Sequence, residues 1–134
     1  MKFTKDYIYD DGGRSKYYRP KKTSNDCVVR SISIALNQDY KDTLIDLCDF
    51  TVLYGEPFNT KNTYEKYLFS KGWLKFKTLI KSNNKKYRIT DLPVNDNCLI
   101  STRRHLTVLI NGVIRDLWDT RNQVAYNYYI CDKK

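Results

Sequence analysis

The sequence is short of several residue types and patterns, and each shortage excludes a class of protein. A single histidine, His105, excludes a zinc site built from two cysteines and two histidines. The cysteines at 27, 48, 98 and 131 form no Cys-x-x-Cys pair, and their even scatter argues against a four-cysteine zinc site. No apolar run is long enough for a membrane span or for the core of a signal peptide. We therefore expect a cytoplasmic protein with reduced thiols, no cofactor, no bound metal and no membrane partner.

The composition predicts one globular domain with a basic surface. A chain of 134 residues with 41% hydrophobic residues can bury a real core, and no internal repeat or second domain is visible. The formal net charge is +9, with basic clusters at 14–22, at 81–86 and at Arg103-Arg104. Residues 1–22 are polar and basic, and we expect them to form an N-terminal arm with a short strand at 6–9. Such a charge balance suits acidic partners.

The apolar patterns predict helices first and strands afterwards, which is typical of the α+β class. Residues 27–38 are apolar around almost the whole circumference of a helix, so this helix is expected to be buried, with Asn25 or Asp26 as its cap. Cys48 and Cys98 follow apolar patterns and are expected to be small core residues. The other expected helices span 40–50 and 63–71. Strands of an antiparallel sheet are expected at 73–79, 98–101, 105–110, 113–119 and 123–130, with 89–94 leading towards the second of them.

Cys27 is the only cysteine in the setting of a nucleophile. It lies where a polar turn changes into the apolar helix, and the first amides of a helix are unpaired and electropositive. A thiol at that place ionises more easily, and the thiolate is the reactive form. The lone His105 is distant in the sequence, and a reactive cysteine with a distant histidine is the minimum for a Cys–His nucleophilic site.

The turn Asn111-Gly112 allows a third residue to be chosen. This dipeptide is a strong hairpin signal, and a two-residue turn places His105, Asp116 and Trp118 on one face of the hairpin. Asp116 is then the diagonal neighbour of His105 and within reach of its imidazole, which it can orient. Asp119 points to the opposite face unless a bulge intervenes. Trp118 is in a position to cover the pair and limit the access of water.

Two motifs carry a resemblance to a known superfamily. Residues 25–32 read N-D-C-V-V-R-S-I, and residues 105–119 fit H-x-x-V-x-x-x-G-x-x-x-D-x-W-D. Both resemble the papain-like cysteine peptidases, and more narrowly small peptidase-like proteins of bacteriophages and bacteria, including bacteriocin-leader-peptidase-like ones. The first motif is also similar to the D-x-x-C-x-x-R-[SA]-[IL] helix of ovarian-tumour deubiquitinases, although Ser24 stands where those have the aspartate.

The resemblance implies a fold, a reaction and a set of site residues. It implies a papain-like domain in which a central N-terminal helix bearing the cysteine packs on a C-terminal antiparallel sheet. It also implies a thiol hydrolase that cleaves an amide or isopeptide bond of a protein or peptide, with the triad Cys27, His105 and Asp116. Papain has a glutamine six residues before its cysteine, where this chain has Lys21, so Asn25 is expected to stabilise the oxyanion instead.

Two alternatives remain open from the sequence. The first is a catalytically inactive papain-fold protein, encoded by a phage, that binds and inhibits an acidic host protein in the bacterial cytoplasm. The second is binding of nucleic acid through residues 14–22, where Tyr17-Tyr18 could stack on bases, although no RNP, KH or zinc-finger pattern supports it. The substrate and the oligomeric state are not determined by the sequence.

Overall fold

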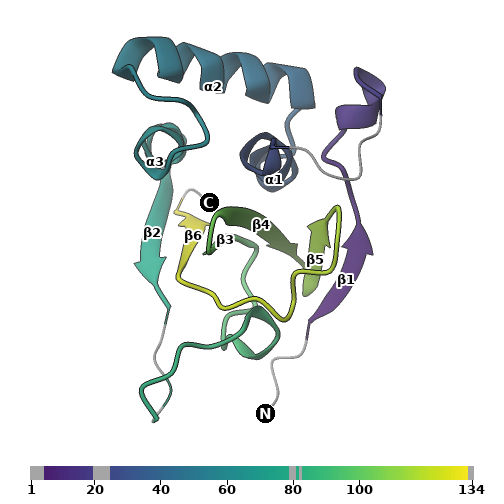
Figure 1. Ribbon diagram of the computed structural model, residues 1–134, viewed down its shortest axis with the longest axis vertical. Coiled ribbons are helices and arrows are strands. Elements are labelled where there is room, and N and C mark those ends of the chain that lie inside the picture. The colour runs from purple at the N-terminus through teal and green to yellow at the C-terminus, as the bar shows by residue number, and fades with distance from the viewer. Residues whose placement is uncertain (1–4, 20–24, 79–80, 82, 133–134) are drawn as a thin grey trace.

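Three helices lie on one face of a six-stranded sheet, and the loop region that contains residues 89–91 lies on the other face (Figure 1). This computed structural model describes residues 5–19, 25–78, 81 and 83–132. The architecture is α+β, as the apolar patterns predict. Among the described residues, no helix combines the length and the apolar character needed to cross a membrane.

The helices form two layers above the sheet. The first helix packs mainly on strand β4 (His105–Ile110), and the second lies across the first and third on their outer side (Figure 1). The second helix is longer than predicted and ends at Gly55, which takes the left-handed conformation that favours glycine (φ 77°). The helices are α1 (Cys27–Leu36), α2 (Tyr40–Tyr54) and α3 (Lys61–Ser70), with short 3₁₀ turns η1 (Arg14–Lys16) and η2 (Ile89–Asp91).

The sheet is mixed, so the prediction of an antiparallel sheet is wrong for one edge. The strands run in the order β1-β5-β4-β3-β6-β2, and β1 pairs with β5 in parallel, whereas the other pairs are antiparallel. The apolar pattern at residues 6–9 predicts a strand but carries no information about its partner. The strands are β1 (Asp6–Tyr9), β2 (Trp73–Lys77), β3 (Cys98–Thr102), β4 (His105–Ile110), β5 (Val113–Asp116) and β6 (Asn127–Cys131).

The hairpin of β4 and β5 has the predicted register. Ile110 pairs with Val113, and both turn residues, Asn111 and Gly112, have positive φ angles, as a type I′ turn requires. The strand that was expected to reach residue 119 ends at Asp116. The register nevertheless carries His105 and Asp116 to the same face of the hairpin, where their side chains meet.

The central strands are buried on both faces. Along β3, Leu99 packs into the core beneath the helices, whereas its neighbours Cys98 and Ile100 pack into a second core on the opposite face. Successive side chains of a strand alternate between faces, so a continuous apolar run fills both cores. Because the central strands are packed on both faces, the side chains at their ends are attached to a rigid backbone.

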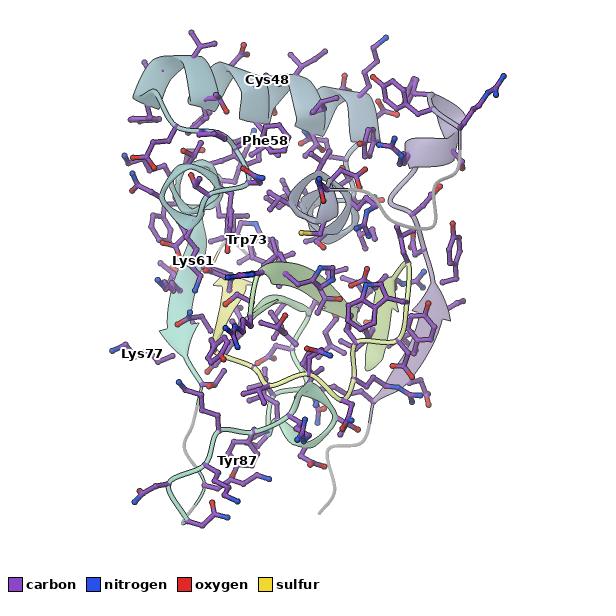
Figure 2. All side chains as sticks on the ribbon, viewed as in Figure 1. Cys48, Phe58, Lys61, Trp73, Lys77 and Tyr87 are labelled. Atoms are coloured by element: carbon purple, nitrogen blue, oxygen red, sulfur yellow. The ribbon has the colours of Figure 1, made fainter. Side chains whose placement is uncertain are left out.

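The two cysteines that were predicted to lie in the core differ in their burial, and the N-terminal arm takes part in the sheet. Cys98 is buried as predicted, but Cys48 is exposed, because α2 is the outermost helix and buries only one side, which includes Leu47 and not Cys48 (Figure 2). The predicted basic arm at 1–22 is described only from residue 5 to residue 19. Within that range, β1 joins the edge of the sheet, and Gly12 passes so close to α1 that a Cβ there would lie 2.7 Å from the carbonyl oxygen of Arg30.

Candidate active site

Cys27 is the first residue of α1, at the end of the helix that faces the start of β4. The contact between the two elements is held by Ser31, whose hydroxyl donates to the carbonyl oxygen of Leu106 (2.7 Å). Val28 and Ile32 pack into the core beneath the same helix. A buried helix tied to a buried strand fixes the position of the thiol, which is half-buried itself.

His105 lies between the thiol and a buried carboxylate. Its Nε2 is 2.7 Å from Oδ2 of Asp116, and because a carboxylate only accepts hydrogen bonds, Nε2–H is the donor. Its ring also takes part in a hydrogen bond with Cys27, for which the remaining nitrogen is Nδ1. The indole of Trp118 lies 5.5 Å from the imidazole, centroid to centroid, but is 45% exposed, so it shields only one side of the pair.

The electrostatics of the site favour a thiolate beside an imidazolium. Burial by itself raises the pKa of the Cys27 thiol, but the hydrogen bond and charge of His105, with the Leu106 amide, bring it below its ordinary value. Burial likewise lowers the pKa of His105, but the hydrogen bonds and negative charges of Asp116 and Cys27 outweigh it and raise that pKa to about 9. At neutral pH the arrangement therefore supports a nucleophilic sulfur with a proton donor next to it.

Arg30 holds the carboxylate of Asp116 from behind. The side chain of Arg30 is only 3% exposed; its Nη1 donates to Oδ1 of Asp116 (3.0 Å) and its Nε donates to Oδ1 of Asp26 (2.8 Å). The backbone amide of Leu117 also donates to Oδ1 of Asp116 (2.7 Å). The hydrogen bonds from Arg30 and from the Leu117 amide both end at Oδ1 of Asp116, so Oδ2 is left to accept from His105. The buried carboxylate is thus oriented by a buried cation one turn along the helix that carries the cysteine.

The carboxylate of Asp26 belongs to this hydrogen-bond network and does not cap the start of α1. Asp26 stands at the N-cap position of α1, but its side chain makes no capping hydrogen bond. Its carboxylate instead accepts from Arg30, from Nη1 of Arg14 (3.0 Å) and from the hydroxyl of Tyr40 (2.7 Å). The expected cap at Asp26 is therefore wrong, because a buried guanidinium competes more strongly for the carboxylate than an amide at a helix end.

Arg30 is the residue of this candidate site that the sequence predictions missed, although a signal was present. It is the one charged side chain in a helix that is otherwise apolar around almost its whole circumference. A charged residue on a buried helix has to be paired. The aspartate four residues earlier, Asp26, identifies one partner by helical spacing, but the second partner, Asp116, comes from a distant strand.

An open cleft of about 700 Å³ lies over the thiol. Cys27 and His105 line it together with Asn25, the residue predicted to stabilise an oxyanion, which is exposed. Asp116 lies behind the histidine, outside the lining. Asp119, the alternative orienting residue, is bound instead by Arg121 (2.8 Å) at the surface. Within the described ranges, no group of three histidine, cysteine or acidic side chains gathers in a way that could hold a metal ion.

No protein-family model, no curated protein and no solved structure matches the chain.

Proposed function

We propose that the protein is a papain-like thiol hydrolase that cleaves an amide or isopeptide bond of a protein or peptide. The observation that carries the proposal is the position of His105, hydrogen-bonded both to the Cys27 thiol and to the buried carboxylate of Asp116. This is the relation between nucleophile, base and orienting residue that a triad needs. The helix start that bears the thiol, packed on a sheet that bears the other two residues, is the arrangement expected of a papain-like domain.

The reaction follows from the protonation states. The Cys27 thiolate attacks the carbonyl carbon, and the C–N bond breaks as protonated His105 gives its proton to the leaving amine, which leaves an acyl thioester. A water molecule then attacks the thioester and loses a proton to His105. The carboxylic acid departs, and the thiolate–imidazolium pair is restored. The Asn25 side chain and the first amides of α1 are the groups we assign to the oxyanion.

Cys27 is expected to be the most reactive thiol of the unmodified protein in mildly acidic solution. At about pH 6 we expect iodoacetamide to alkylate Cys27 at least about tenfold faster than Cys48, because only the thiolate reacts and an ordinary thiol with a pKa near 8.5 is almost fully protonated there. Mass spectrometry of the separate cysteine peptides across a pH series measures both rates in one sample. Cys48 is exposed on α2 and serves as the internal standard.

Labelling of Cys27 at the rate of Cys48 or below it, at every pH, would overturn the assigned nucleophile. Hydrolysis itself is tested by incubating a mixed peptide library with the protein and with the Cys27→Ala variant. New peptide termini are expected with the unmodified protein and not with the Cys27→Ala variant. Fast labelling of Cys27 without any new termini would instead favour the alternative of an inactive protein that binds its partner.

A further inference from the structure

The cleft over Cys27 is lined by cations. Lys61 from α3 and Arg103-Arg104 from the turn between β3 and β4 all contribute to its walls. No aspartate or glutamate among the described residues lines the cleft, and none forms an ion pair with either arginine. Concave surfaces lined by one sign of charge concentrate ligands of the opposite sign. The cleft is therefore built for a negatively charged ligand at the reacting sulfur.

The turn that carries the two arginines has an unfavourable sequence for its backbone. Thr102 pairs with His105, so Arg103-Arg104 is a two-residue turn, and Arg104 has a φ of 58°, a conformation that favours glycine or asparagine. At the opposite end of β4, the equivalent turn is the favourable Asn111-Gly112. A bulky residue kept in this conformation next to His105 indicates a role for its side chain.

Lys61 is a third site for a negative group. Its side chain is exposed and lines the cleft, and the local desolvation there, with the charge of Lys75, lowers the pKa of its ammonium against the smaller opposing effect of Glu65. A cation that is poorly compensated within the protein gains most from an added carboxylate. Lys61 and the arginine turn lie on different elements, so together they can contact more than one carboxylate of an extended ligand.

We propose that the cleft selects an acidic segment of polypeptide, with glutamate or aspartate side chains close to the scissile bond. The proposal names the substrate class of the hydrolase proposed above and rests on that function. Arg103 and Arg104 bind carboxylates by paired N–H donors, and Lys61 adds a point charge. Peptide is favoured over nucleic acid because the cleft contains an acyl acceptor, Cys27, beside its proton donor, His105.

The test measures binding to the full-length Cys27→Ala variant, which cannot cleave the ligand. Fluorescence anisotropy compares a labelled glutamate-rich peptide, the same peptide with glutamine in place of glutamate, and a labelled oligothymidylate. We expect the glutamate peptide to bind at least about tenfold more tightly than the glutamine peptide. Adding Arg103→Glu and Arg104→Glu to this variant is expected to weaken its affinity for the glutamate peptide at least about tenfold, because both substitutions reverse a charge that lines the cleft.

The control variant has the same change in net charge, but at two positions outside the cleft. Lys77→Glu with Lys85→Glu alters two exposed lysines outside the lining, and Lys77 points outward from the edge strand (Figure 2). This variant is expected to change binding by about twofold or less. Equal affinity for the two peptides, equal effects of the two double variants, or tighter binding of oligothymidylate would each overturn the proposal. Labelling of Cys27 is measured separately, so failure of the hydrolase proposal is distinguished from failure of acidic selection.

Discussion

Replacing Arg30 with leucine is expected to lower the free energy of unfolding by about 3–5 kcal/mol, the range measured when one partner of a buried ion pair is removed. Arg30 is buried and contacts two carboxylates, those of Asp26 and Asp116. Leucine fills much of the volume but provides no donor. Asp116, itself 1% exposed, would then remain charged in the interior with one fewer donor.

Chemical denaturation followed by tryptophan fluorescence measures this loss. The control is Arg115→Leu, because Arg115 pairs with Asp10 (3.2 Å) where the two side chains are 35% and 24% exposed. A pair that is open to solvent is expected to contribute less than about 1 kcal/mol. Similar losses for the two variants would contradict the assignment of Arg30 as the buried counter-charge.

The effect of Arg30→Leu should depend on pH. Near pH 4 the carboxylates of the variant can be neutralised by protonation, whereas at pH 7 they are forced to remain charged or to shift their pKa at the expense of stability. We therefore expect the difference in stability between wild type and variant to be smaller near pH 4 than at pH 7. Arg30→Lys, which keeps the charge but not the two-pronged geometry, is expected to be intermediate.

Replacing Asp116 with asparagine is expected to slow the alkylation of Cys27 at about pH 6 by about tenfold or less. The carboxylate is a main cause of the raised pKa of His105, about 9 against an ordinary 6.5. Each pKa unit corresponds to about 1.4 kcal/mol in favour of the protonated imidazole, and thus of the thiolate beside it. Without the negative charge, the burial of the imidazole is opposed less and lowers the pKa of His105, so fewer molecules hold a protonated imidazole beside the Cys27 thiolate in mildly acidic solution.

The measurement is the pH profile of Cys27 labelling by iodoacetamide, with Asp119→Asn as the matched control. Asp119 is an aspartate of the same sequence motif, but it is bound to Arg121 at the surface, so its variant is expected to keep the wild-type profile. His105→Ala is expected to lose at least as much reactivity as Asp116→Asn. A profile that moves with Asp119 and not with Asp116 would assign the orienting role to Asp119 instead.

Local patterns in the sequence determined most of the elements around the site. The apolar circumference of the first helix predicts its burial, and Asn111-Gly112 predicts the turn and the register that carries His105 and Asp116 to one face. Cys27 could be singled out because a polar turn followed by an apolar run marks a helix start. These features depend on side-chain periodicity and backbone conformation, which neighbouring residues specify.

Only the tertiary structure decided which distant groups meet. The parallel pairing of β1 with β5, the exposure of Cys48 on the outer helix and the contact of Arg30 with Asp116 all depend on how elements pack, which no local pattern encodes. The same is true of the cleft, where Lys61 and the arginine turn converge from separate elements on one thiol. The sequence by itself therefore determined the candidate reacting groups, and the packing of helix on sheet determined their partners, because burial forces charged side chains from distant segments to pair.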